Sequence, residues 1–191
     1  QRAFRHGKAA SLVPLQQAPM QIVPAVSYFA VFLGRPPRPG SPYLAAAGVG
    51  GLVLADFDAV DLSNLQRQLL HTSERIGMTK VDSAIRTLTA INPDVNLESI
   101  KGSLTEANLG QIVAGVDLVV DACDNFATRF AINAACCAAR VPLVSGAAIR
   151  TEGQIAVFAG QPGGPCYQCL YPRDGSMDET CTANGVLAPV V

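Results

Sequence analysis

The stretch L-V-L-A-D at residues 52–56 decides the fold class. It is a short apolar run that ends in an acid, the pattern of a buried strand that brings a carboxylate to one edge of a sheet. The run V-D-L-V-V-D-A at residues 116–122 predicts a second such strand. Helix patterns alternate with these and other strand patterns, which predicts an open, doubly wound, mostly parallel α/β sheet. The further elements are predicted as helices over 79–91, 105–113 and 126–139, and strands over 95–100, 142–145 and 154–158.

Composition favours one globular domain. The chain has 191 residues, of which 49% are hydrophobic and 15% charged, enough apolar surface for a packed core. Its formal net charge of −1 argues against general electrostatic binding of nucleic acid. The longest apolar stretch, residues 20–33, is interrupted by Pro24 and is too short to span a bilayer. With no signal-peptide pattern at the N-terminus, we expect a cytoplasmic protein without a membrane partner.

The chain divides into three predicted segments. Residues 1–42 are rich in Pro and Gly, notably G-R-P-P-R-P-G-S-P at 34–42, and are predicted to be irregular. Residues 43–160 form the predicted nucleotide-binding α/β domain, which begins at the end of a helix that stops at Gly48. Residues 161–191 form a loop region that contains cysteines.

Polar residues after the first predicted strand form a candidate site. Asp56 ends this strand, and a carboxylate in that place in a nucleotide-binding fold commonly holds ribose hydroxyls. Asn64, Arg67 and Gln68 follow in a polar segment with few apolar anchors. A solvated loop with a helix N-cap at Ser63 explains this segment as well as a binding role does.

Two further positions fit phosphate chemistry. Lys80 begins a predicted helix, where its ammonium group can act as a mobile charge, while Arg67 offers a planar fork. Two such cations are useful where a triphosphate must be neutralised. Asp124 follows the second predicted strand and could hold Mg²⁺, which prefers carboxylate and phosphate oxygens. The alternative is that Asp124 or Asn125 only caps the next helix.

The cysteines suggest metal or redox chemistry. Six cysteines are too few for a disulfide scaffold, but Cys166 and Cys169 form a C-x-x-C motif. This spacing can present two thiolates to one tetrahedral Zn²⁺, and a redox pair is the alternative. Cys136 and Cys137 lie in an apolar helix pattern, which favours buried structural thiols.

Five motifs in this order resemble the ThiF/MoeB/HesA family, the bacterial relatives of ubiquitin-activating enzymes. The resemblance covers residues 43 to 191 and implies a Rossmann-like sheet with helices on both faces. The motifs are D-F-D-A-V-D-L-S-N-L-Q-R-Q (56–68), G-M-T-K (77–80), D-A-C-D-N (121–125), V-P-L-V-S-G-A-A-I-R-T-E-G-Q (141–154) and P-C-Y-Q-C-L (165–170).

The resemblance also implies an activity. Family members are homodimers that adenylate the C-terminal glycine of a ubiquitin-like sulfur-carrier protein, using Mg·ATP and releasing pyrophosphate, in molybdopterin or thiamine biosynthesis. Cys181 matches the family's active-site cysteine, and Arg5 faintly matches an arginine that reaches the partner subunit's ATP. The other implied roles are ribose binding by Asp56, nucleotide and phosphate contacts by Asn64, Arg67, Gln68, Lys80 and Asn125, Mg²⁺ binding by Asp124, and half of a Cys₄ zinc site from Cys166 and Cys169.

Two departures from the family pattern keep other functions open. The expected G-x-G-x-x-G turn is replaced by F-L-G-R-P-P-R-P-G-S-P-Y-L at 32–44, whose prolines remove amide donors and disfavour a normal helix start. The chain also ends at Val191, before the second C-x-x-C that the family would supply. The alternatives are a catalytically impaired homologue that dimerises or binds the carrier, and an NAD-dependent oxidoreductase, which lacks its dinucleotide fingerprint here.

Overall fold

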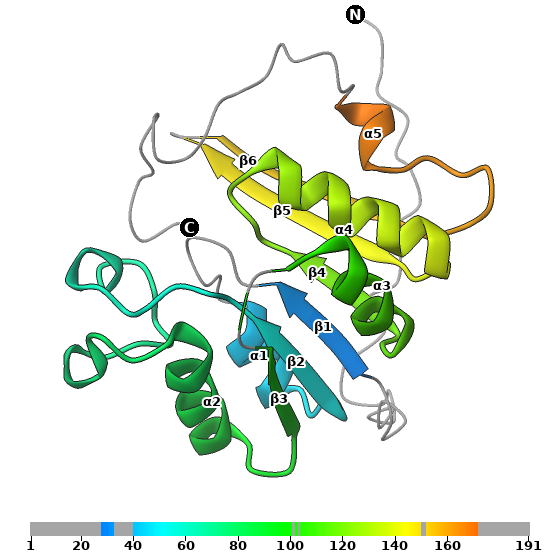
Figure 1. Ribbon diagram of the computed structural model, residues 1–191. Helices are drawn as coiled ribbons and strands as arrows, with labels where there is room; N and C mark the ends of the chain where they lie inside the picture. Colours follow the sequence, from blue (N-terminus) through cyan, green and yellow to red (C-terminus); the bar gives the residue numbers. More distant parts are fainter. Residues whose placement is uncertain (1–27, 33–39, 101, 103, 150–151, 172–191) are drawn as a thin grey trace, which may run out of the picture.

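A six-stranded sheet forms the centre of the computed structural model, which describes residues 28–32, 40–100, 102, 104–149 and 152–171 (Figure 1). The strand order is β3-β2-β1-β4-β5-β6, so consecutive strands run outward from β1 in both directions. The strands are β1 (Tyr28–Phe32), β2 (Gly51–Ala55), β3 (Asn96–Ile100), β4 (Leu118–Asp121), β5 (Leu143–Ile149) and β6 (Glu152–Phe158).

The five strands β1 to β5 are parallel, and β6 alone pairs antiparallel with β5. In the ladder, Phe32 at the end of β1 lies opposite Ala55 of β2 and Asp121 of β4. The carboxyl ends of these three strands therefore share one edge, and the strand order reverses there. Ligands of open α/β sheets bind at such an edge. The doubly wound, mostly parallel sheet predicted from the sequence is confirmed.

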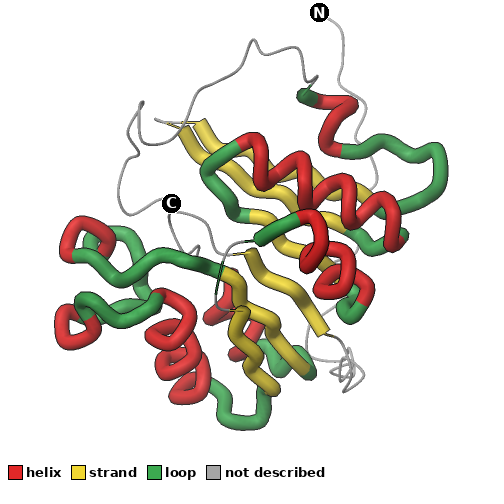
Figure 2. The backbone as a smooth tube through the Cα atoms, in the orientation of Figure 1, coloured by secondary structure: helices red, strands yellow, loops and turns green. Residues whose placement is uncertain are grey.

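Helices cover both faces of the sheet (Figure 2). Helices α1 and α2 pack over one core with Leu52 and Leu54 of β2, and α3 and α4 pack over another with Val119 of β4. No helix in the described ranges is long and apolar enough to cross a membrane. The helices are α1 (Gly40–Ala46), α2 (Lys80–Ile91), α3 (Glu106–Ala114), α4 (Phe126–Ala139) and α5 (Tyr167–Leu170), with short 3₁₀ turns η2 (Leu62–Asn64) and η3 (Ser73–Arg75).

Local capping chemistry sets where the helices begin and end. Thr79, Thr105 and Asn125 each accept a hydrogen bond from a backbone N–H in the first turn of the helix that follows. Gly48, after α1, has φ +76°, a left-handed conformation that glycine adopts without strain. The helix bounds predicted from the sequence agree with the structure within one residue, including the stop at Gly48.

The N-terminal segment departs from its prediction in two places. The sequence predicts irregular structure over 1–42, but β1 lies there and pairs with β2 and β4 on its two sides. A parallel strand inside a sheet needs no polar alternation, so Y-F-A-V-F carried no strand period. Helix α1 also begins as early as Gly40, with Pro42 in its first turn, where a missing amide hydrogen costs nothing. The prediction of irregular structure is wrong for both elements.

Candidate functional site

Asp56 directly follows β2, and its side chain is only 4% exposed. Its Oδ1 accepts a hydrogen bond from the Asp58 N–H at 2.8 Å, while Oδ2 is buried without a hydrogen-bond partner in the part of the chain described. Burial raises the pKa of Asp56 to about 6, although the nearby Lys80 charge lowers it. A buried carboxylate oxygen that accepts no hydrogen bond is a place where a ligand hydroxyl could donate one.

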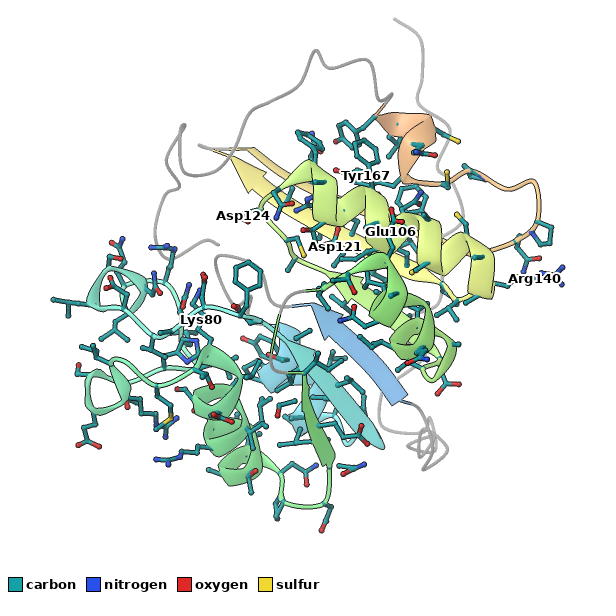
Figure 3. All side chains as sticks on the ribbon, viewed as in Figure 1. Lys80, Glu106, Asp121, Asp124, Arg140 and Tyr167 are labelled. Atoms are coloured by element: carbon teal, nitrogen blue, oxygen red, sulfur yellow. The ribbon has the colours of Figure 1, made fainter. Side chains whose placement is uncertain are left out.

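Lys80 begins α2, and its side chain is 1% exposed (Figure 3). Its Nζ lies 2.7 Å from Asp58 Oδ2 and 3.9 Å from Asp56 Oδ2. The Lys80 backbone N–H also donates to the Asp58 carbonyl at 2.9 Å, beside an isolated bridge between Ala59 and Thr79. The prediction of a mobile charge is therefore wrong: the ammonium group is buried and held by two carboxylates.

The segment after Asp56 buries several polar atoms. Asn64 is 7% exposed and Gln68 is fully buried. Both side-chain polar atoms of Gln68, and Nε of Arg67, have no hydrogen-bond partner among the described residues, although Arg67 Nη1 donates to the Ser63 carbonyl at 2.9 Å. The predicted N-cap at Ser63 is wrong, because Asp61 caps η2 and accepts from the Ser63 N–H at 2.8 Å. This is more than a solvated loop, since solvated side chains are not buried.

Side chains from α2 hold this segment in place. Arg75 Nη1 donates to the Ser83 carbonyl at 2.9 Å and to Thr87 Oγ1 at 2.7 Å. His71 is buried, and its Nδ1 lies 2.9 Å from Ser83 Oγ. Burial, followed by the charges of Lys80 and Arg75, lowers the pKa of His71 to about 4. His71 is therefore neutral at pH 7. The hydrogen bonds of His71 and Arg75 hold the chain between them against α2.

Asp121 ends β4 and is satisfied internally. Its side chain is 1% exposed, and Oδ2 lies 3.2 Å from Arg129 Nη1 and accepts from Ser145 Oγ at 3.0 Å. Its Oδ1 accepts from the Cys123 N–H at 2.9 Å. This carboxylate stabilises the turn after β4 and is not available to a ligand.

Asp124 differs from Asp121 although it lies only three positions further along the chain (Figure 3). It is half-buried and has no hydrogen bond or ion pair with any residue that the structure describes. Its charge is one of the influences that raise the pKa of Asp56, so the two carboxylates interact across the strand ends. Asn125 Oδ1 accepts from the Thr128 N–H at 2.8 Å, so Asn125, and not Asp124, caps α4.

The C-x-x-C thiols lie close together at α5. The Sγ atoms of Cys166 and Cys169 are 3.9 Å apart. Tetrahedral zinc with Zn–S bonds of about 2.3 Å separates two thiolates by about 3.8 Å, so the pair fits half of a zinc site. Within the described ranges, no group of three or more His, Cys, Asp or Glu residues could hold a metal ion. The structure leaves both the zinc and the redox interpretation of the pair open.

Of the two cysteines predicted to be buried in α4, one is buried and one is exposed. Cys136 is 2% exposed, and burial raises its pKa to about 12, which confirms a structural thiol. Cys137 is exposed, so its predicted burial is wrong; its thiol lies beside the C-x-x-C pair, and partial burial, followed by its interactions with Cys166 and Cys169, raises its pKa. Cys181 and Arg5 lie outside the described residues.

Sequence reasoning missed the residues that organise the site. Asp58 was visible in D-F-D but was not assigned to Lys80, because their pairing depends on a bridge formed across the intervening segment. Arg129 stands four residues after the helix cap, in the spacing D-N-x-x-x-R, and this spacing was the available signal. It places a cation one helical turn from the loop after β4.

A parallel sheet whose strand order reverses beside two carboxylates and a buried cation defines a doubly wound α/β domain, the class of fold that binds ligands at such an edge. The sequence model described as the ThiF family matches residues 40–191, and the chain belongs to this family. The match covers most of the chain and agrees with the resemblance inferred from the five motifs.

Individual relatives give the same assignment. The chain is 53% identical over 151 residues to the molybdopterin-synthase adenylyltransferase of Escherichia coli, covering 79% of this chain and 61% of the relative. It is 45% identical over 159 residues to the sulfur carrier protein ThiS adenylyltransferase of the same organism, covering 83% and 63%. The chain thus spans about three-fifths of the length of these curated relatives. A solved structure of E. coli tRNA N6-threonylcarbamoyladenosine dehydratase in complex with AMP is similar with TM-score 0.64 and 26% identity, covering 70% of this chain and 56% of that one.

Proposed function

We propose that the chain belongs to a nucleotidyltransferase that uses ATP to adenylate the C-terminal glycine of a ubiquitin-like sulfur-carrier protein and releases pyrophosphate. Membership of the ThiF family and the names of the relatives support this proposal. The observation that carries it is the edge beside β1, at the ends of the strands on its two sides. There the buried Oδ2 of Asp56 and the carboxylate of Asp124 accept no hydrogen bond from any described residue.

The residues present fit a bound nucleotide. Asp56 Oδ2 would accept a hydrogen bond from a ribose hydroxyl, and the buried Gln68 amide offers both a donor and an acceptor. Arg67, with Asn64 beside it, would contact phosphate oxygens through its remaining N–H groups. Lys80 would act as a fixed charge, because Asp58 already holds its ammonium group in place.

The proposed reaction needs alignment more than a strong base. The carrier's carboxylate is ionised at neutral pH and attacks the α-phosphorus of ATP, while the bond to the pyrophosphate oxygen breaks. Arg67 and Lys80 would reduce the charge that opposes this attack. Asp124 would hold Mg²⁺, which supplies further charge neutralisation on the phosphates. Arg5 of a partner subunit and Cys181 complete the proposed set, and Asn125 contributes through its cap of α4.

We also propose that Cys166 and Cys169 supply half of a zinc site, completed by ligands outside the described residues. Their sulfur separation supports this proposal, as does their place at a short helix where one turn brings both thiols together. Metal analysis of purified protein tests it. Cys166→Ser should lower the zinc content, whereas the Asp94→Asn variant, at an exposed position, should keep it. Full zinc content in Cys166→Ser would contradict the site.

Carrier-dependent exchange of labelled pyrophosphate into ATP tests the proposed activity directly. We expect exchange with Mg·ATP and a carrier that ends in Gly-Gly, and loss of at least tenfold in Asp124→Ala because the metal ligand is removed. The exposed Asp94→Ala variant is the matched control. Comparison of molybdopterin-type and thiamine-type carriers identifies the partner, and the molybdopterin type is proposed first because of the higher identity. Carrier binding without exchange would instead favour an impaired homologue.

Gel filtration with light scattering tests the proposed homodimer, and fractionation of cells tests the proposed cytoplasmic location. The dimer matters for chemistry, because Arg5 would then reach the ATP of the partner subunit. A strictly monomeric protein with full exchange activity would contradict this role of Arg5.

A further inference from the structure

Arg129 lies in the first turn of α4 and is 6% exposed. Its guanidinium group donates hydrogen bonds to backbone and side-chain acceptors in β4, in the loop after β4, and in β5. A buried arginine with this many fixed partners is held in one orientation. Its acceptors are Asp121 Oδ2 at 3.2 Å and Ser145 Oγ at 2.9 Å from Nη1, and the Cys123 carbonyl and the Gly146 carbonyl, the latter at 2.9 Å, from Nη2.

The loop after β4 is fixed on both sides of Asp124. Before it, the Cys123 N–H donates to Asp121 Oδ1 at 2.9 Å, and the Cys123 carbonyl accepts from Arg129 Nη2. After it, Asn125 caps α4 and its carbonyl accepts from the Arg129 N–H at 3.2 Å. Asp124 has no hydrogen bond of its own in the described structure, so these neighbours set the position of its backbone, from which the side chain projects.

The opposite side of Arg129 faces the C-x-x-C segment. Its Cζ lies 5.9 Å from the centre of the Tyr167 ring, which is within cation–π range. The Tyr167 N–H donates to Asn133 Oδ1 at 2.9 Å, and Asn133 lies one helical turn after Arg129 on α4. Tyr167 follows Cys166 directly and is 4% exposed. Helix α4 therefore contacts both the loop that carries Asp124 and Tyr167 of the C-x-x-C segment, which are labelled in Figure 3.

We propose that Arg129 is a positioning residue: it fixes the backbone before Asp124 so that this carboxylate faces a metal-bound nucleotide, and it holds the C-x-x-C segment through Tyr167. The inference rests on the proposed function, because it takes Asp124 as the metal ligand. Without the bond from Arg129, the Cys123 carbonyl loses its partner and the loop samples more conformations. Binding of the metal-bound nucleotide must then order the loop, and this entropy cost weakens the affinity for nucleotide in the presence of Mg²⁺.

The test measures the metal-dependent part of nucleotide affinity. Calorimetry with a non-hydrolysable ATP analogue measures two Kd values for each variant, one without Mg²⁺ and one with it. The Kd ratio is the value without Mg²⁺ divided by the value with Mg²⁺. Arg129→Lys keeps a positive charge beside Asp121, which protects the fold, but an ammonium group cannot make the fork to Cys123 and Gly146. We expect it to lower the ratio about tenfold, with metal-free affinity unchanged within twofold. Arg86→Lys, at an exposed site on α2, is the matched control and should keep the wild-type ratio.

A double-mutant comparison separates positioning from general damage. Asp124→Asn should bring the Kd ratio close to one, and adding Arg129→Lys should change it no further, because both act through one carboxylate. A second readout is the rate at which an aromatic disulfide labels Cys166 and Cys169, located by peptide mass spectrometry. Arg129→Lys and Tyr167→Leu should both raise this rate several-fold, and Arg86→Lys should not.

The outcomes distinguish this inference from the proposed function. Wild-type protein that binds the analogue equally with and without Mg²⁺ would overturn both. If the wild-type ratio is large but Arg129→Lys leaves it intact, or lowers metal-free affinity to the same extent, only the positioning role of Arg129 is overturned. Additive effects in the double variant would overturn it as well.

Discussion

At the scale of single residues, Asp56 combines a proposed place in the nucleotide site with burial that disfavours its ionised form. Its pKa is raised to about 6 from 3.8, so the folded protein keeps its proton to a higher pH than the unfolded chain does. The free energy of unfolding therefore falls as the pH rises from about 4 through 6, by up to about 3 kcal/mol from this group. Asp56→Asn should be more stable than wild type above pH 7 and should bind nucleotide more weakly.

Urea unfolding between pH 4 and 8, without nucleotide, measures this difference. The stability gain of Asp56→Asn should be small near pH 4 and should reach its full size above pH 6. Asp94→Asn, at an exposed position, controls for the loss of one carboxylate. Parallel pH profiles for wild type and Asp56→Asn would contradict the raised pKa.

His71 should give the opposite pH dependence. Its pKa is lowered from 6.5 to about 4, so its contribution to stability is complete above pH 6.5 and is lost as the pH falls toward 4. The loss is up to about 3 kcal/mol, because the unfolded chain binds a proton that the folded protein does not. His71→Asn keeps a polar group for Ser83 and should remove this dependence in urea unfolding. His6→Asn, which changes the chain's other histidine, is the control and should keep the wild-type profile.

The opposite signs of these two residues make single variants necessary. As the pH falls from 6 to 4, Asp56 stabilises the fold, because it binds its proton more readily in the folded protein. The same fall in pH destabilises the fold through His71, which binds its proton more readily in the unfolded chain. The wild-type profile shows only their sum, which can be nearly flat. Equal pH profiles of wild type and His71→Asn would contradict the lowered pKa of His71.

At the scale of elements, the cap of α4 tests how Asn125 contributes. Asn125→Ala removes the acceptor of the Thr128 N–H and should lower the free energy of unfolding by about 1 kcal/mol. Asn125→Ser retains a capping oxygen and should restore most of the stability, as measured in urea. It should also bind nucleotide like wild type, since the Asn125 oxygen is used within the helix. Weak nucleotide binding by a stable Asn125→Ser variant would show that the amide contacts the ligand.

Elements with local signals were predictable from the sequence, and those fixed by distant partners were not. Helix α4 was predicted with its observed bounds because its capping residue and apolar period are both local. Strand β1 was missed because its place inside the sheet depends on β2 and β4, which follow it in the chain. The prediction of a doubly wound, mostly parallel sheet was still correct without β1, because the other strands and helices alternate along the chain.

The same distinction holds for the candidate site. Asp56 and Asp124 were predicted at one sheet edge because each follows a strand pattern, and the parallel pairing of β1 with β2 and β4 brings both strand ends to that edge. The burial of Lys80 against Asp58 was not predictable, because 21 residues separate them and only the fold joins them. The network around Arg129 likewise joins α4 to β5 and α5 by contacts that no sequence period marks.

At the scale of the whole molecule, the sheet separates two cores. Leu88 of α2 lies in the core on one face and Leu109 of α3 in the core on the other; both are at most 1% exposed. They share no core cluster, so each Leu→Ala change should cost about 2–5 kcal/mol of the free energy of unfolding, and the double variant should show the sum within about 0.5 kcal/mol.

The continuous strand ladder predicts that both cores nevertheless unfold together. Every strand from β3 to β6 is hydrogen-bonded to its neighbour, so losing one core removes support from the sheet that the other core needs. Urea unfolding should show one transition by circular dichroism and by tyrosine fluorescence in each variant. Leu69→Ala, at a side chain 73% exposed, is the control and should change stability by less than about 0.5 kcal/mol. Two separated transitions in either core variant would mean that the sheet does not couple its two faces, and that each half folds by itself.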